Sequence, residues 1–183
     1  MRIISGKSKG KRIETTHGPG TRPVTDRIKG AVFNILGKVL KGADVLDLFA
    51  GSGAMGLEAL SRGAKSAVFI EKDQGCVGMI RKNLQNTGVI HSEVYRKDVM
   101  IGLKLIPAKK KFSIVFVDPP FNSGLVEKAL LLLGDGDILR KNALVICRAH
   151  HKDLMPDRSG RLLLFRTERY GENLVGFYRV QSV

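Results

Sequence analysis

Hydrophobic positions along the chain alternate between two spacings from residue 43 onward. Short apolar runs that end in polar residues predict β-strands at 44–49, 66–71, 92–98, 112–117 and 143–149. Between these runs, apolar residues recur at helical spacing, as Val77, Ile80 and Leu84 do, and predict helices at 54–63, 74–88, 99–105 and 126–133. Alternating strands and helices are typical of a parallel sheet that helices cover on both faces.

Both ends of the chain depart from this alternation. Residues 161–170 and 173–180 are apolar segments around a Gly-Glu-Asn turn, and they predict a closing antiparallel hairpin. Residues 1–24 are rich in Gly and Lys and predict a small β-hairpin with a basic tip. A helix follows that Thr25 or Asp26 can cap and that Gly42 closes. We therefore expect an N-terminal extension, 1–24, and an α/β domain, 25–183.

Composition narrows the class of protein. The chain has 183 residues, of which 43% are hydrophobic, and this suits one domain with its own core. Its net charge of +14 favours a polyanionic partner, most often nucleic acid. Cys76 and Cys147 lie far apart, and no apolar run approaches a membrane span, so we expect a monomeric cytoplasmic protein without disulfides or membrane contact. The histidines lack metal-ligand spacing, so no metal is expected.

A glycine-rich loop follows the first strand of the α/β region. Gly51, Gly53 and Gly56 satisfy the pattern G-x-G-x-x-G, and Glu71 ends the next strand. This arrangement supports a ligand that contains adenosine, because glycines let the backbone approach it and the acid can bind ribose hydroxyls. Asp47 precedes the glycines and would repel a pyrophosphate. S-adenosylmethionine, with an ammonium, a sulfonium and no phosphate, fits this loop better.

Acids after three consecutive strands form the predicted cofactor array. We expect Asp47 near the ammonium group, Glu71 at the ribose diol and Asp98 at the adenine amino group. Asp98 equally suits the N-cap of a helix that begins at Val99. The full set of predicted cofactor residues is Asp47, Phe49, Gly51, Ser52, Gly53, Glu71, Lys72, Asp98 and Asp118.

The segment Asp118-Pro119-Pro120-Phe121 ends the fourth strand. Two prolines fix the backbone, so we expect the Asp118 carboxylate and the Pro119 carbonyl to form a rigid pair of acceptors for an exocyclic amine. Phe121 then offers a face on which a nucleobase can stack. All four residues are candidate catalytic residues. An ion pair that turned the carboxylate away from the cofactor crevice would contradict this assignment.

Two longer stretches carry a family resemblance. DPPF beside VLDLFAGSGAMGLEALSRGA resembles the amino-methyltransferases that use S-adenosylmethionine. TRPVTDRIKGAVFNIL and the opening MRIISGKSKGKRI resemble the bacterial 16S ribosomal RNA guanine-N2 methyltransferases of the RsmD type, over almost the whole chain. The resemblance implies a Rossmann-like, seven-stranded fold and methylation of one guanine amine in small-subunit ribosomal RNA, within an assembled or assembling particle. Arg148 stands where such proteins lead us to expect an acid, and we expect it to add to the RNA-facing charge.

Basic residues near the N-terminus are the candidate RNA contacts. They are Lys7, Lys9, Lys11 and Arg12 on the hairpin tip, with Arg22 and Arg27 bordering the active site. Other functions stay open at this point. The DPPF residues would also serve an adenine-N6 methyltransferase acting on DNA or RNA. The glycine loop would also suit a dehydrogenase or a non-catalytic RNA-binding module that holds a nucleotide cofactor.

Overall fold

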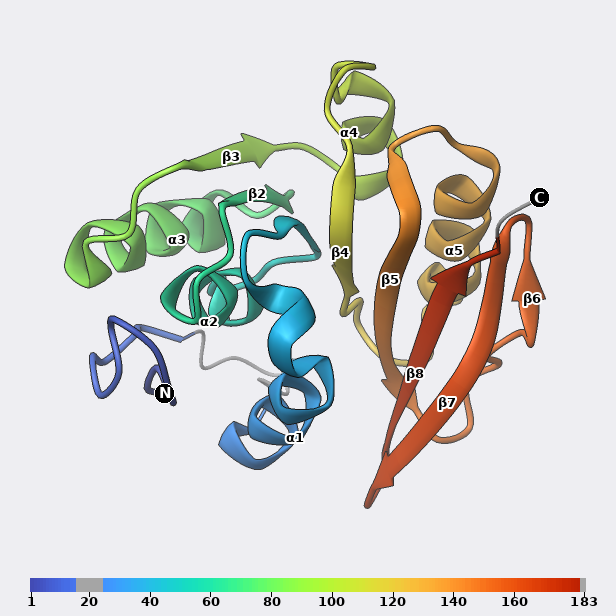
Figure 1. The fold of residues 1–183 in the computed structure, drawn as a ribbon, viewed down its shortest axis with the longest axis horizontal. Helices are drawn as coiled ribbons and strands as arrows, with labels where there is room; N and C mark the ends of the chain where they lie inside the picture. The colour runs from blue at the N-terminus through green and yellow to red at the C-terminus, as the bar shows by residue number, and fades with distance from the viewer. Residues whose placement is uncertain (16–24, 182–183) are drawn as a thin grey trace.

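A single mixed sheet organises the chain in the computed structural model, which describes residues 1–15 and 25–181 (Figure 1). Its strands lie in the order β3-β2-β1-β4-β5-β8-β7-β6. Pairing is parallel from β3 to β5 and antiparallel from β5 through β8 and β7 to β6. The strands are β1 (Asp44–Leu48), β2 (Ser66–Glu71), β3 (Ser92–Arg96), β4 (Phe112–Val117), β5 (Leu139–His150), β6 (Arg158–Ser159), β7 (Leu162–Tyr170) and β8 (Asn173–Val180).

The predicted fold class is confirmed, with one difference in the number of strands. The sheet has eight strands rather than seven, because the two-residue strand β6 pairs with the start of β7. The β7–β8 hairpin closes the sheet as expected. Its tip lies beside the carboxyl end of β5, because His150 pairs with Asn173.

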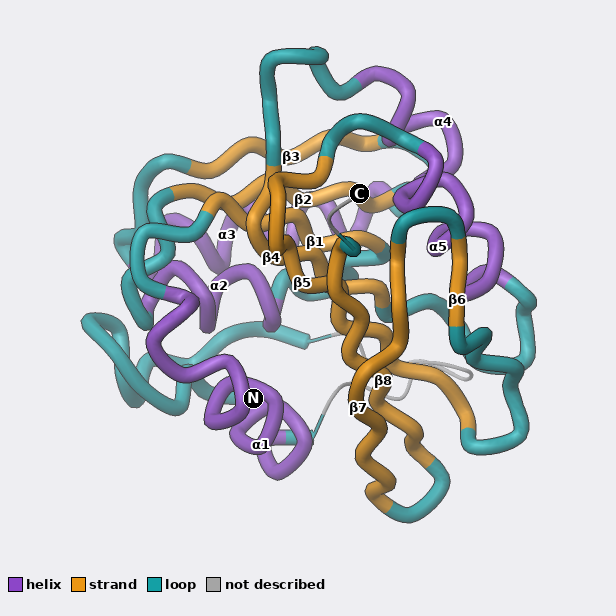
Figure 2. The backbone as a smooth tube through the Cα atoms, turned by 45° about the vertical axis from the view of Figure 1, so that its right-hand side comes forward, coloured by secondary structure: helices purple, strands orange, loops and turns teal. Residues whose placement is uncertain are grey.

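Helices cover both faces of the sheet (Figures 1 and 2). On one face lie α1 (Asp26–Leu36), the 3-10 helix η1 (Gly37–Leu40), α2 (Ala54–Ser61) and α3 (Gln74–Thr87), and on the other α4 (Val99–Leu105) and α5 (Leu125–Asp135). Successive side chains of a strand point to opposite faces. Accordingly, Val45 of β1 packs with the first set of helices, and Leu46 and Leu48 pack with the second. Within the described ranges, no helix is long and apolar enough to cross a bilayer.

Two predicted boundaries are wrong for local reasons. The first helix was expected to close at Gly42, but α1 ends at Leu36 because Gly37 has a φ of 49° and breaks the helical path. The fifth strand begins at Leu139 rather than Ala143. Leu139 is buried and pairs with Phe112, whereas the exposed polar residues that follow it hide this pairing in the sequence.

The N-terminal segment, residues 1–15, docks against the ends of α2 and α3. Its hairpin is minimal, with one antiparallel bridge between Arg2 and Arg12. The turn lies directly on α2, where the Ser8 amide donates to Ser61 Oγ at 3.0 Å. A Cβ atom on Gly6 would lie 1.9 Å from the Ser61 carbonyl oxygen, so only glycine fits there. The division of the chain at residue 24 stays a prediction.

A buried carboxylate on α2 holds this segment in place. The oxygens of Glu58 accept the amides of Ile4 at 2.8 Å and Ser5 at 3.0 Å, and Nε of Arg62 at 2.7 Å. Lys29 of α1 places its ammonium 3.5 Å from Glu58, and neither side chain is exposed to solvent. One buried charge cluster therefore joins α1, α2 and the N-terminal segment.

We expect Glu58→Gln to lower the free energy of unfolding by about 3 kcal/mol, because, among the described residues, the buried Lys29 ammonium would lose its only buried counter-charge and keep only the half-exposed Asp26 at 3.5 Å. Urea denaturation measures the change. Glu14→Gln is the matched control, since it removes the pair with Lys82, whose two side chains are 49% and 59% exposed. That control should cost about 0–1 kcal/mol. Similar small losses in both variants would mean that the Glu58 cluster does not stabilise the fold.

Candidate active site

Acids meet at the carboxyl edge of the parallel strands. Strand β1 lies between β2 and β4, so successive connections leave it in opposite directions, and ligand crevices form at such points. Burial raises the pKa of Asp47 well above its usual value, and the nearby charges of Asp118 and Glu71 raise it further. The structure therefore brings these three predicted acids together.

Asp47 is a buried carboxylate that supports the start of α2. Its residue is 2% exposed, and Oδ2 accepts the amide of Gly56 at 2.9 Å. A Cβ atom at Gly56 would lie 2.3 Å from the Phe69 ring, so the last glycine of the motif lets α2 pack against β2 and reach Asp47. The expected contact of Asp47 with a cofactor ammonium stays a prediction.

Glu71 holds the glycine loop in its turn. Its Oε2 accepts the Gly51 amide at 2.9 Å, and its Oε1 accepts the Asp73 amide at 2.9 Å. Phe49 and Gly51 both have positive φ, of 58° and 54°, which keeps the turn tight. In a dinucleotide loop the glycine amides face phosphate. Here the Glu71 carboxylate accepts from the Gly51 amide. The loop is therefore lined by a hydrogen-bond acceptor with negative charge, which suits a cationic ligand without phosphate.

The other predicted cofactor residues surround this loop. Gly53, with a φ of 76°, is the N-cap of α2, and Ser52 beside it is buried, whereas Lys72 is exposed after β2. Asp98 accepts the Met100 amide at 2.9 Å and caps α4, which confirms the N-cap alternative. Its contact with adenine stays a prediction.

Asn83 is a buried residue that the sequence reasoning missed. From α3, its Nδ2 donates to the carbonyl oxygens of Ser52 and Glu14, both at 3.0 Å, and its Oδ1 accepts the Glu14 amide at 2.8 Å. The glycine loop and the N-terminal segment are thus tied to the same side chain. In the sequence, the only indication of this role is that Asn83 is an amide residue among the apolar positions of the predicted helix.

The Asp118 carboxylate forms a two-point ion pair with Arg148 of β5. Nε lies 2.7 Å from Oδ1 and Nη2 lies 3.0 Å from Oδ2. Val117 pairs with Cys147 in neighbouring strands, so the residues that follow them come side by side. Burial raises the pKa of Asp118, and the Arg148 charge and hydrogen bonds lower it. The side chains are only 18% and 11% exposed.

This ion pair corrects two expectations. The Asp118 carboxylate is not a free acceptor, because both of its oxygens accept from Arg148. Arg148 does not add to the RNA-facing charge, because its guanidinium turns inward to that carboxylate. Asp118 nevertheless lines a hollow together with Phe116, and its role toward the reacting amine stays a prediction.

The rest of the DPPF loop is held from the end of β5. The Phe121 ring lies 5.0 Å from Cζ of Arg148 and 5.9 Å from the ring of His150. Oδ2 of Asp153 accepts the amides of Asn122 at 3.3 Å and His150 at 2.9 Å. Phe121 is therefore fixed between a planar cation and a second ring.

Two hollows meet at Arg148. One is an open hollow beside Asp118 and Phe116, and Ile28 and Val32 of α1 also line it. The other is an open hollow lined by the two prolines of the DPPF segment, among other residues. Arg148 lines both hollows. The helix that follows the N-terminal extension thus borders the Asp118 side of the site.

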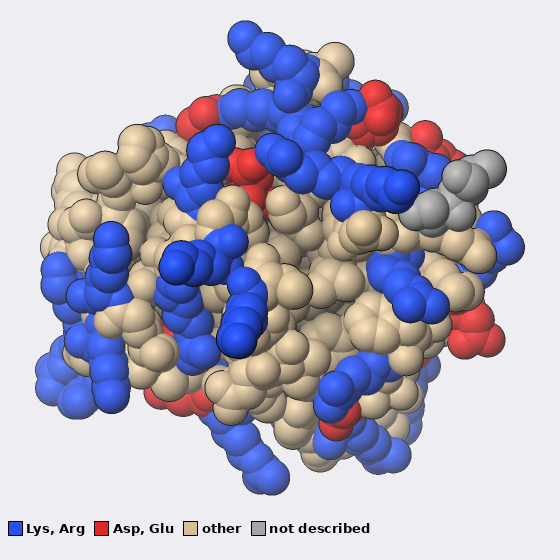
Figure 3. All heavy atoms as spheres, in the orientation of Figure 1, with Lys and Arg blue, Asp and Glu red and all other residues tan. Residues whose placement is uncertain are grey.

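Basic side chains are distributed over the face shown in Figure 3. Of the predicted RNA contacts, Lys7, Lys9, Lys11, Arg12 and Arg27 are all exposed, and Lys11 in addition donates to the Thr87 carbonyl at 2.9 Å. Arg22 lies outside the described residues.

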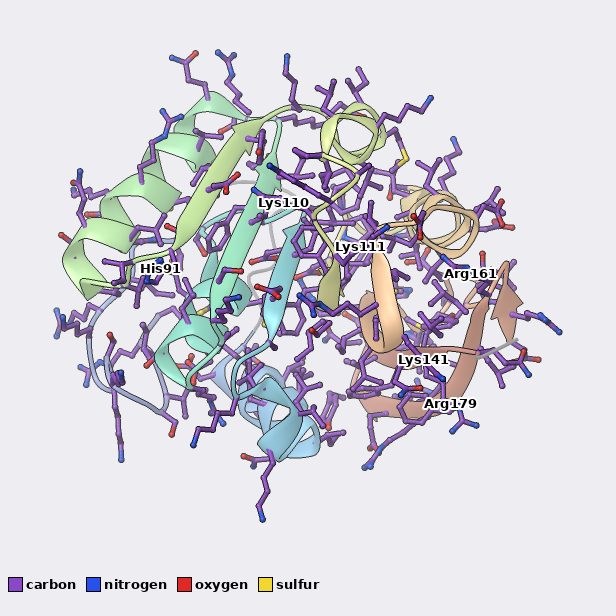
Figure 4. All side chains as sticks on the ribbon, turned by 45° about the horizontal axis from the view of Figure 1, so that its top comes forward. His91, Lys110, Lys111, Lys141, Arg161 and Arg179 are labelled. Carbon is purple, nitrogen blue, oxygen red and sulfur yellow. The ribbon has the colours of Figure 1, made fainter. Side chains whose placement is uncertain are left out.

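A second group of cations follows the opposite, amino-terminal edge of the sheet (Figure 4). Two of them, Lys110 and Lys111, are paired with Glu93 and Asp137. The positive charge of the chain is therefore not confined to the side that carries the acids.

The sheet order, the acid-lined glycine loop and the DPPF loop define the class of Rossmann-like methyltransferases that use S-adenosylmethionine. The family described as Conserved hypothetical protein 95 matches residues 1–179, and the chain belongs to this family, the RsmD family.

The relatives are similar over nearly their whole length. Ribosomal RNA small subunit methyltransferase D of Escherichia coli K12 is 37% identical over 184 residues, covering 100% of this chain and 91% of the relative. Among solved structures, the candidate methyltransferase yhhF from Escherichia coli has a TM-score of 0.86 at 36% identity, with 100% and 99% of the two chains covered. The candidate methylase HI0767 from Haemophilus influenzae has a TM-score of 0.82 at 33% identity, with 99% and 98% covered.

The raised pKa of Asp47 predicts a pH dependence of stability. Folding favours the neutral acid relative to the unfolded chain, so the stabilising contribution of Asp47 is complete below the unfolded pKa of about 3.9 and is lost as pH rises through the folded pKa. The stability of the parent relative to Asp47→Asn should therefore fall between pH 4 and pH 8 in urea titrations.

Asp73→Asn is the control with the opposite sign. Hydrogen bonds from Cys76 lower the pKa of Asp73, so its contribution is present above the unfolded pKa and is lost on acidification. A flat difference curve for Asp47→Asn across this range would show that its carboxyl group titrates normally.

Proposed function

We propose that this methyltransferase transfers a methyl group from S-adenosylmethionine to the exocyclic N2 amine of a guanine in 16S ribosomal RNA. The rigid DPPF loop at the carboxyl edge, beside the acid-lined glycine loop, carries this proposal. The relative named for the small ribosomal subunit supports ribosomal RNA over DNA as the substrate.

The residues of the glycine loop fit the cofactor. S-adenosylmethionine, when bound, supplies an electrophilic methyl group on a sulfonium. The carboxylates of Glu71 and Asp118, with the buried Asp47 carboxyl group beside them, suit its cationic groups and disfavour a pyrophosphate. The remaining residues that we propose to line the site are Phe49, Gly51, Ser52, Gly53, Lys72 and Asp98.

The DPPF residues orient the amine. A guanine N2 amine is a poor nucleophile because its lone pair is conjugated with the ring, and acceptors at Asp118 and Pro119 would hold its hydrogens so that the lone pair turns out of that plane. Phe121 would stack on the base, worth about 1–3 kcal/mol. Burial raises the pKa of Asp118, so its carboxylate is suited to take the proton that N2 loses.

The RNA contacts complete the proposal. Exposed Lys7, Lys9 and Arg12 on the N-terminal segment and Arg27 on α1 would bind phosphates, with Arg22 as a further candidate. Lys11 would act mainly by anchoring the segment to α3. We propose that a monomer acts in the cytoplasm on an assembled or assembling small subunit.

Asp118→Ala should reduce methylation of small-subunit particles by about 10²-fold or more, because it removes an acceptor for the reacting amine. Binding of S-adenosylhomocysteine, followed by calorimetry, should be largely retained. Asp118→Asn keeps the shape of the side chain and so separates a loss of activity from a loss of folding. Asp137→Ala is the control at an exposed acid remote from the site.

Nucleoside analysis of the product tests the substrate. N2-methylguanosine is expected, and methyladenosine as the only product would end the guanine assignment. An Asp118→Ala variant with the parent rate would remove the role given to Asp118. Heat on adding NAD, with none on adding S-adenosylhomocysteine, would favour the dehydrogenase.

The double variant Lys7→Glu, Lys9→Glu should bind 16S ribosomal RNA more weakly and with a shallower salt dependence. Each lost phosphate contact lowers the slope of log affinity against log salt by about 0.7–0.9. Filter binding over a range of salt concentrations measures the slope. Lys109→Glu, Lys141→Glu makes the same charge change at exposed positions on the amino-terminal edge. Equal slopes for the two double variants would place the RNA elsewhere.

A further inference from the structure

Arg148 presents to Asp118 a pair of donors that matches one edge of guanine. Its Nε and Nη2 belong to one planar N–C–N unit and donate to the two carboxylate oxygens at 2.7 and 3.0 Å. The N1–H and N2–H groups of guanine also come from one planar N–C–N unit and point the same way. A carboxylate that accepts one of these forks has the geometry to accept the other.

The contact with the Phe121 ring is a second feature that Arg148 shares with the proposed guanine base. It lies 5.0 Å from Cζ of Arg148, within the range in which a guanidinium plane interacts with an aromatic face. An extruded base would need the same ring for stacking. Arg148 therefore engages both groups, the Asp118 carboxylate and the Phe121 ring, that the proposed function assigns to the target base.

Arg148 also borders the hollows beside the DPPF loop and is anchored at its far end. It lines both the hollow beside Asp118 and the hollow beside Pro119 and Pro120. Its Nη1 donates to Oδ1 of Asn173 at 3.0 Å, which anchors the guanidinium to β8 at its far end. The guanidinium is therefore held on two sides, by Asp118 after β4 and by Asn173 of β8.

We propose that Arg148 occupies the guanine position in the RNA-free enzyme and that the target base displaces it, an inference that rests on the proposed function. Entry of guanine exchanges one two-donor fork on Asp118 for another. Adenine offers an acceptor at N1 beside its amine, so it cannot replace the second donor, and the broken pair would stay uncompensated. Arg148 is thus a specificity-determining residue as well as an internal competitor.

Binding of free guanosine tests this proposal directly. The parent, Arg148→Ala and Arg148→Lys are each saturated with S-adenosylhomocysteine at pH 8, and guanosine and inosine are titrated by calorimetry. Guanosine should bind both variants about tenfold or more tightly than the parent, because its competitor is gone or has lost the forked geometry. Inosine lacks the N2 amine and should change by less than about threefold. Arg148→Lys keeps a positive charge beside Asp118 and so controls for the ionisation of that acid.

Kinetics on small-subunit particles give a second readout. If Arg148 competes with the base, the Arg148→Lys substitution lowers KM. If Arg148 only supports Asp118, the same substitution lowers kcat instead. Should Arg148→Ala fail to fold, Asn173→Ala loosens the same guanidinium from its far anchor and should also tighten guanosine binding. Guanosine affinity that is unchanged or weaker in all the folded variants overturns the inference.

The two proposals fail separately. If the parent enzyme yields N2-methylguanosine but guanosine binds the Arg148 variants no more tightly than the parent, only the displacement is refuted. A parent enzyme that yields no N2-methylguanosine refutes the proposed function, whatever Arg148 does.

Discussion

Three carboxylates crowded at one edge of the sheet impose the constraint on which the site depends. Asp47, Glu71 and Asp118 lie at or just after the ends of neighbouring strands, and the charges of Glu71 and Asp118 act on Asp47. Like charges in a partly buried site need local donors. Each donor found here fixes a different part of the site. The Gly56 amide sets the start of α2, the Gly51 amide closes the glycine loop, and Arg148 positions the DPPF loop.

Buried polar contacts extend this constraint to the N-terminal segment. Asn83 joins the segment to the glycine loop, and Glu58 joins it to α1 and α2. Buried polar groups are costly unless they are fully bonded, so these contacts favour one arrangement of the segment. The exposed cations that we propose for RNA binding therefore sit on a support shared with the cofactor loop. Phosphate contacts there can set the register of the RNA relative to the reacting edge.

Hydrophobic periodicity predicted most of the fold, and strand ends predicted the acids. The bounds of β2, β4, β8 and α4 agree with the expected ranges because each has uninterrupted apolar spacing and a clear stop. Tertiary pairing was beyond such reasoning. The sequence shows that Arg148 is a cation, but its direction depends on the alignment of β4 with β5 and on Asn173 of β8. The buried Lys29–Glu58 pair escaped notice for the same reason, since periodicity does not reveal which charges meet.

The positive charge of Arg148 also affects the protonation of Asp118. An isolated buried carboxylate tends to take up a proton, and a protonated acid loses one of its acceptors. Burial indeed raises the pKa of Asp118, and the adjacent guanidinium opposes that shift. Arg148 thus favours the ionised carboxylate for as long as no base is present. Once a neutral base replaces the cation, the opposing charge is weakened and the affinity of Asp118 for a proton rises. The same displacement that admits the amine would then prepare the group that accepts its proton.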